Sequence, residues 1–228
     1  MKISKFFFSL IVGVVLSSAV YAQNTDERTL TPFDELKVYG EVKVYLEKGE
    51  AEHAKVITED IPVKDIITEI DGKTLIVKLK SNIYKNVRAE VYVTYRELRE
   101  VSTSAAASIS LNSTLNADKI TLDINTSSEF VGEISANTGT FTVGQGATLR
   151  LNGNVKNYEA KVNTGGILSA LDCKSDSTFV TVSSGGIAKV FASKLLDAKV
   201  RTGGSLTITG KPEQKKVKTF LGANVIEQ

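Results

Sequence analysis

The chain has 228 residues, with seventeen glycines, three prolines and no tryptophan, a profile of short strands and turns rather than helices. Its formal net charge of +2 comes from Lys2 and Lys5, because without them 26 Lys and Arg residues face 26 acidic ones. A balanced charge excludes the electropositive field that concentrates nucleic acid or anionic lipid. The composition therefore predicts no nucleic-acid partner, and the length suits one domain.

The first 22 residues have the organisation of a cleavable signal peptide. Lys2 and Lys5 precede an apolar run from Phe6 to Val15, and small residues including Ala22 follow it. This run is shorter than the roughly 20 apolar residues that a membrane-spanning helix needs. We therefore expect an exported protein, located in the periplasm, on the outer-membrane surface or outside the cell, with no transmembrane segment after cleavage.

Cys173 is the only cysteine, which excludes an internal disulfide in this exported chain. The only histidine, His53, lies in a charged, turn-like segment and is not an evident partner for a reactive thiol. We interpret Cys173 as a small apolar residue of the core. No metal site and no cofactor are predicted.

Residues 23–31 are polar and are expected to form a loosely held leader. Alternation of apolar and polar residues then indicates strands, at residues 36–39, 42–46, 55–58, 75–79 and 89–95. Asp71-Gly72 predicts a tight hairpin turn. Because strands begin at Val38, Val56 and Leu75, about one repeat length apart, we predict irregular coils of a single repeat over residues 32–100.

Residues 101–210 repeat one short pattern, in which a β-branched residue is followed by a polar pair and two small residues, as in Val162-Asn-Thr-Gly-Gly. Six such frames begin 23, 19, 19, 20 and 18 residues apart, at Val101, Ile124, Val143, Val162, Val182 and Val200. A constant period near 20 residues indicates one supersecondary unit stacked on copies of itself.

The alternation within each frame indicates which side chains face the core. Two or three short strands per coil of about 19 residues, with coils about 4.8 Å apart, account for the period. The small residues suit tight corners, and the Thr or Ser before them is expected to point inward or lie at the corner, passing hydroxyl hydrogen bonds along the stack. An antiparallel barrel would need hairpin turns at half this spacing. The sequence therefore predicts an all-β, parallel β-helix that forms a single domain over residues 32–228.

The outward positions of the repeats form the predicted binding surface. They present hydroxyl, amide and charged groups at regular spacing on a flat strand face, namely Ser102, Asp123, Asn125, Lys161, Asn163, Ser183, Lys199 and Arg201. Such a ladder suits an extended polar polymer such as a glycan, bound through many weak hydrogen bonds. This face is expected to lack the aromatic platform of most sugar sites, so the same residues are also compatible with a solvated surface.

Catalysis on this scaffold is the weaker alternative, because polysaccharide hydrolases and lyases need paired carboxylates, or acids for calcium beside a base. No second acid is expected beside Asp123 on the outward face, and Glu100, one coil below, is the nearest. We assign no catalytic residue.

The Gly-Gly corners lack the following helix that a phosphate cradle requires. Residues 211–228, rich in lysine, are predicted to form a charged C-terminal cap over the last coil.

The segment Phe33-Asp-Glu-Leu-Lys-Val-Tyr-Gly40, the small-residue corners and the closing Gly210-Lys-Pro212 resemble the DUF2807 family, also called the autotransporter adhesin head domain or GIN domain. The resemblance covers about residues 30–228. It implies a right-handed, single-stranded parallel β-helix in an exported protein of the Bacteroidetes type, and it supplies no catalytic or ligand positions. We therefore predict a non-catalytic cell-envelope binding module of the adhesin type. Its expected partners are surface glycans or, as the alternative, an envelope protein in a structural or regulatory role.

Overall fold

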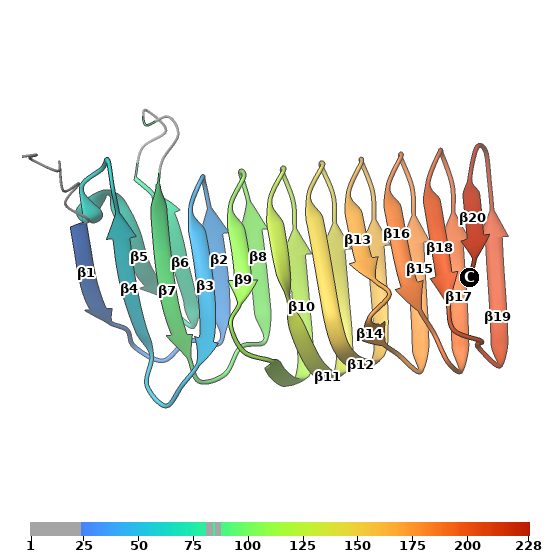
Figure 1. Ribbon diagram of the computed structural model, residues 1–228, viewed down its shortest axis with the longest axis horizontal. Coiled ribbons are helices and arrows are strands. Elements are labelled where there is room, and N and C mark those ends of the chain that lie inside the picture. Colours follow the sequence, from blue (N-terminus) through green and yellow to red (C-terminus); the bar gives the residue numbers. More distant parts are fainter. Residues whose placement is uncertain (1–23, 81–83, 85–87) are drawn as a thin grey trace, which may run out of the picture.

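The computed structural model describes residues 24–80, 84 and 88–228, so the predicted signal peptide lies outside the described residues. Two flat sheets lie face to face along the long axis of the molecule and meet at a row of sharp corners along one long edge (Figure 1). We call them the front and back sheets, as they appear in Figure 1. Within the described part of the chain, no helix is long and apolar enough to span a membrane.

The front sheet, from the N-terminal end of the stack, consists of β1 (Asn24–Thr29), β4 (His53–Thr58), β7 (Ala89–Tyr95), β3 (Lys43–Lys48), β9 (Ser108–Leu111), the first residues of β11 (Glu129–Val143) and β12 (Thr148–Val162), β13 (Ile167–Ala170), β16 (Ile187–Phe191), β18 (Ser205–Thr209) and β20 (Asn224–Glu227).

The back sheet consists of β5 (Ile66–Asp71), β6 (Thr74–Leu79), β2 (Glu35–Tyr39), β8 (Glu100–Ser104), the last residues of β10 (Leu115–Ile124), β11 and β12, then β15 (Ser177–Val182), β17 (Leu195–Val200) and β19 (Gln214–Thr219). The first residues of β10 pair with the middle residues of β11, which pair with the middle residues of β12. The middle of β12 pairs in turn with the short β14 (Cys173–Lys174) on the edge opposite the corners. A single turn of 3₁₀ helix, η1 (Val63–Asp65), precedes β5.

The strand register confirms the predicted parallel β-helix. Ile124, Val143, Val162, Val182 and Val200 lie side by side in one row of parallel strands, one from each successive coil. The coils form a solenoid with a repeat of about 19 residues. The first frame is the exception, because Val101 lies opposite Leu122 and not Ile124. Ser102 is consequently a neighbour of Asp123, two residues away from the position that the repeat pattern assigned to it.

The corners are built from two successive left-handed residues, as at Thr164 and Gly165 with φ of 46° and 71°. The Thr or Ser at this point is exposed and lies at the corner, the second of the two predicted placements, and not inward. The Thr126 hydroxyl donates to the side-chain oxygen of Gln145 on the next coil at 2.7 Å, and main-chain bonds also connect the corners, as where the Gly165 N–H donates to the Ser184 carbonyl at 3.1 Å. The next small residue packs against backbone, since a Cβ on Gly166 would lie 2.5 Å from the carbonyl oxygen of Val143.

Aliphatic rows fill the space between the two sheets. Cys173 is fully buried in this core, as predicted, and burial raises the pKa of its thiol to about 11. Phe141 and Tyr158 from neighbouring coils pack with ring centroids 5.3 Å apart. Apolar burial along the whole axis is the dominant stabilising term in a chain without disulfides.

The first third of the chain does not follow the predicted order of coils. The rung made by β2 and β3 lies between the rung of β6 and β7 and the rung of β8 and β9, with all of these pairs parallel. β4 is antiparallel to β7, and β5 is antiparallel to β6. The even spacing of Val38, Val56 and Leu75 therefore does not mark three successive coils. The turn at Asp71-Gly72 is confirmed, with Gly72 at φ 62°.

Both termini of the described chain differ from expectation. Six residues of the predicted loose leader form β1, which pairs antiparallel with β4 along its whole length. At the other end, residues predicted to cover the last coil form a further rung, in which β19 pairs with β17 and β20 pairs with β18, both in parallel. Each end of the stack therefore consists of strand residues.

Candidate binding surface

The predicted ladder residues all lie on the outer face of the back sheet or at its turn into the corners. One row across the strands contains Ser102, Asp123, Thr142, Lys161, Thr181 and Lys199. The residues two positions further along each strand form a second row, namely Ser104, Asn125, Gly144, Asn163, Ser183 and Arg201. The parallel register thus brings side chains from six coils to one flat surface, as the repeat pattern predicts.

Gly144 forms a notch in the second row. A Cβ at Gly144 would lie 2.6 Å from Oδ1 of Asn163 and 2.9 Å from Oδ1 of Asn125. The amide oxygens from the coils on either side therefore converge over the missing side chain. The Asn125 amide nitrogen donates a hydrogen bond to the Asp123 carboxylate, which holds the Asn125 oxygen toward the notch. The notch thus brings hydrogen-bond acceptors from two separate coils close together.

Further along the same face, Phe179 lies in a hollow of about 230 Å³ lined by Glu159, Val180, Thr181, Asp197 and Lys199. Phe179 is 42% exposed, so the prediction that this face has no aromatic residue is wrong. The repeat frames missed it because it lies two residues before Thr181, outside the two rows that were compared. Its register partners are Glu159 and Asp197, which give the aromatic ring an acidic surround.

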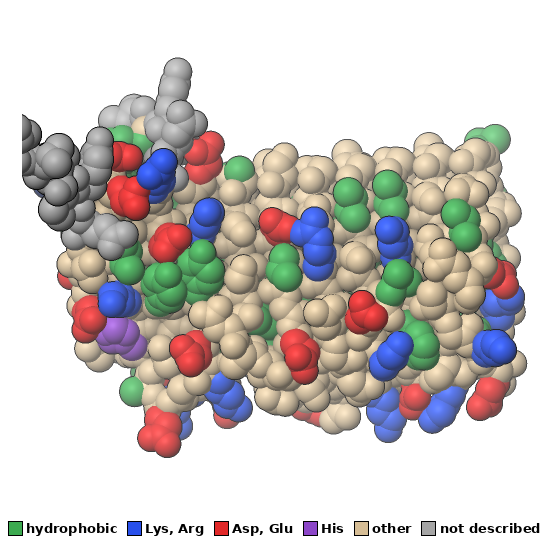
Figure 2. Space-filling view, in the orientation of Figure 1, with side chains coloured by type: hydrophobic (Ala, Val, Ile, Leu, Met, Phe, Trp, Pro, Cys, Tyr) green, Lys and Arg blue, Asp and Glu red, His purple; other side chains and the backbone are tan. Residues whose placement is uncertain are grey.

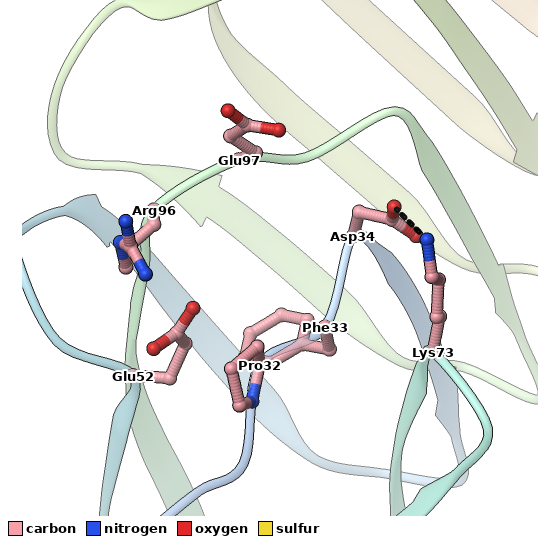
Figure 3. A pocket seen from close by; sticks show the side chains of 7 residues that line it. All are labelled: Pro32, Phe33, Asp34, Glu52, Lys73, Arg96 and Glu97. Atoms are coloured by element: carbon pink, nitrogen blue, oxygen red, sulfur yellow. Dashed lines mark ion pairs between the residues drawn. The ribbon is translucent and has the colours of Figure 1, made fainter.

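A separate cleft of about 250 Å³ lies near the N-terminal end of the stack (Figure 3). It is lined by Pro32, Phe33, Asp34, Glu52, Lys73, Arg96 and Glu97. Sequence reasoning missed this group of acids because the residues come from four segments that only the fold brings together. In Figure 3 the Glu52 side chain points toward Arg96, whereas Glu97 points away from the centre of the cleft.

Asp34 is held by cations. Its carboxylate accepts a hydrogen bond from Arg99 at 2.6 Å and lies 3.8 Å from the Lys73 ammonium. The Arg99 hydrogen bond is the largest cause of a lowered Asp34 pKa. A general acid for glycoside cleavage needs the opposite shift. We therefore assign Asp34 no role as a general acid. Within the described residues, no three His, Cys, Asp or Glu side chains are grouped to hold a metal ion.

The fold is a β-solenoid with a flat polar face. The family model described as "Putative auto-transporter adhesin, head GIN domain" matches residues 32–212, and the chain belongs to this family. No curated protein matches the sequence.

Several solved structures share the fold, of which three are compared below. A "putative adhesin" of Bacteroides fragilis superposes with a TM-score of 0.83 at 14% identity, covering 91% of this chain and 97% of that one. A "putative adhesin" of Parabacteroides merdae gives 0.69 at 18% identity, covering 90% and 96%. A "putative lipid binding protein" of Parabacteroides distasonis gives 0.67 at 18% identity, with the same coverage. At these identities the likeness shows the architecture alone.

Proposed function

We propose that this protein is an exported binding module of the cell envelope, of the adhesin type and without catalytic activity, and that it binds glycan chains along its back sheet. The family description and the names of two proteins with the same fold support an adhesin role. The observation that carries the glycan assignment is the pair of amide oxygens, from Asn125 and Asn163, that converge over Gly144.

The two rows of the back sheet suit a chain of sugars for physical reasons. Hydroxyl, amide and ammonium groups recur at the spacing of neighbouring strands, about 4.8 Å, so an extended polymer meets a new set of partners at each coil. Sugar hydroxyls donate to the amide oxygens at the notch and accept from Lys161 and Arg201. Phe179 offers an apolar surface to the C–H groups of a sugar ring. Each contact is weak, and affinity comes from their number along one chain.

A glycan array probed with residues 23–228 tests the assignment. Wild-type protein is expected to retain a subset of glycans, and the double substitution Asn125→Ala with Asn163→Ala is expected to weaken retention about tenfold, the loss of one or two hydrogen bonds to uncharged groups. The matched control is Asn152→Ala, an exposed asparagine outside the two rows, which should leave binding unchanged. Glycan binding that survives the double substitution would remove the back sheet as the site.

The alternative partner is an envelope protein. A pull-down from envelope extracts separates the two ideas, because capture of one defined protein together with a silent glycan array would support the structural or regulatory role. Soluble product released from a polysaccharide panel, with or without calcium, would contradict the non-catalytic assignment.

A further inference from the structure

The front sheet carries a tyrosine pair that has no counterpart in the repeats. Tyr92 on β7 and Tyr45 on β3 are direct neighbours in the parallel register. Their rings stack with centroids 4.8 Å apart and planes 19° from parallel. Figure 2 shows the front sheet, with hydrophobic side chains gathered over β7 and β3. Tyr92 is 37% exposed, so this stack stands at the surface and not in the core.

Glu90 holds both rings in place. Its two carboxylate oxygens accept hydrogen bonds from the Tyr92 hydroxyl at 3.0 Å and from the Tyr45 hydroxyl at 3.5 Å. The hydrogen bond with Glu90 is the largest cause of the raised pKa of Tyr92. Burial is the largest cause of the raised pKa of Tyr45. Both phenols stay neutral and their hydroxyls are already engaged. The ring faces, rather than the hydroxyls, are what the pair can offer to a ligand.

The ring face of Tyr45 that does not contact Tyr92 faces a neighbouring strand, where the residue beside it is small. Across the next two coils its row continues with Ser110 and then Val131. Neighbouring strands are about 4.8 Å apart, so Tyr45 and Val131 lie about 10 Å apart with only a hydroxymethyl group between them. A ring in contact with both walls needs about 7–8 Å, twice a carbon–carbon contact distance. The spacing of the row therefore leaves room for one ring beside Ser110, between Tyr45 and Val131, and we call this place the slot.

The rim of this slot is polar. The neighbouring row, two residues earlier on each strand, contains Lys43, Ser108 and Glu129. Glu129 is ion-paired with Arg150. The slot thus combines an aromatic wall with donors and acceptors of both charge signs. An apolar ring alone would place apolar surface against these polar groups, whereas a ring that carries hydroxyls on its edge would exchange hydrogen bonds with them.

We propose that the slot over Ser110 binds one neutral pyranose ring of a glycan, as a second sugar site on the face opposite the ladder. The C–H face of the sugar lies on Tyr45, because aromatic faces carry negative charge density and sugar C–H groups are slightly positive. The sugar hydroxyls reach Ser108 and Ser110. This inference shares the glycan-binding role proposed above, but it rests on different residues on a different sheet.

Calorimetric titration of residues 23–228 with cellohexaose, mannohexaose and maltohexaose tests the proposal. At least one of these is expected to bind wild-type protein, and Tyr45→Ala should weaken it about tenfold. Tyr45→Phe keeps the ring and should retain the affinity. Ser110→Leu fills the slot while leaving Tyr45 intact, and it should weaken binding as much as Tyr45→Ala. Thermal unfolding monitored by circular dichroism confirms that each variant is folded.

Phe179→Ala reports on the back-sheet site, where the proposed function places Phe179, and Asn152→Ala, at an exposed residue outside both sites, is the control that should leave binding unchanged. Binding that is insensitive to both Tyr45→Ala and Ser110→Leu would overturn the proposal. If binding is lost in Phe179→Ala or in the double asparagine variant but retained in these two, the sugar lies on the back sheet alone. That result would reject the second site and leave the proposed function intact. Absence of binding to all three oligosaccharides at millimolar concentration would also reject it.

Discussion

The two ends of the stack differ in the charged side chains that point inward between the sheets. At the N-terminal end, Arg28 of β1 lies opposite the buried Ala54 and so points inward. It reaches across to the other sheet and donates hydrogen bonds to the carbonyls of Ile66 at 2.7 Å and Val63 at 2.9 Å. At the C-terminal end, Lys215 and Glu227 occupy inward rows next to Leu196 and Ile208, and they pair at 2.7 Å between the two sheets.

The difference lies in burial. The Arg28 side chain is only 20% exposed, whereas Lys215 and Glu227 are 41% and 57% exposed. A shielded guanidinium that satisfies carbonyl oxygens contributes much to stability, while an exposed ion pair contributes little. Charged side chains at inward positions do, however, oppose the addition of another strand to an open sheet edge. We infer that Arg28 stabilises the N-terminal end of the stack, and that Lys215 and Glu227 oppose association at the C-terminal end.

Replacement of Arg28 is expected to have the largest effect. Arg28→Ala leaves two carbonyl oxygens without their charged donor and should lower the free energy of unfolding by about 2–4 kcal/mol. Urea denaturation measures it. Arg88→Ala is the matched control, because Arg88 is 73% exposed in its pair with Glu59, and it should cost less than about 1 kcal/mol. Equal losses of unfolding free energy in the two variants would show that Arg28 contributes no more to stability than an exposed arginine.

Acid should weaken the N-terminal part of the stack through Asp34. Its pKa is lowered in the folded state by Arg99, so the stabilisation is present above the ordinary pKa of about 3.9 and is lost as pH falls through the lower folded value. Asp34→Asn should therefore reduce the fall in melting temperature below about pH 4. The variant would itself be less stable than wild type at neutral pH.

Asp176, whose pKa is lowered by Lys194, is the control from the C-terminal half. Its side chain is 31% exposed against 16% for Asp34, so solvent screens it more. Asp176→Asn is expected to change the fall in melting temperature below about pH 4 less than Asp34→Asn does. A larger change for Asp176→Asn would contradict the prediction that Asp34 contributes more to the acid sensitivity.

The smallest effect on stability is expected at the C-terminal pair. The double substitution Lys215→Val with Glu227→Val should change the free energy of unfolding by less than about 1 kcal/mol, as for other exposed pairs. Its effect should appear in self-association, because the inward positions of the last rung then carry apolar side chains and no charge opposes the addition of another strand at the open edge. Sedimentation velocity over a range of concentrations measures this. A variant that stays as monodisperse as wild type would show that the pair does not protect the edge.

The parallel coil, its corners and the polar face of the back sheet were all predicted from the sequence. Alternation decides which side of a strand faces inward, and a constant period places equivalent residues side by side, so Asn125, Gly144 and Asn163 had to be neighbours. The order of the strands in the first third of the chain could not be predicted in this way. The alternation of apolar and polar residues within a strand does not depend on which other strand pairs with it. Only the tertiary structure inserts β2 and β3 between later rungs, attaches β1 as an edge strand, and brings Tyr45 against Tyr92 above the slot at Ser110.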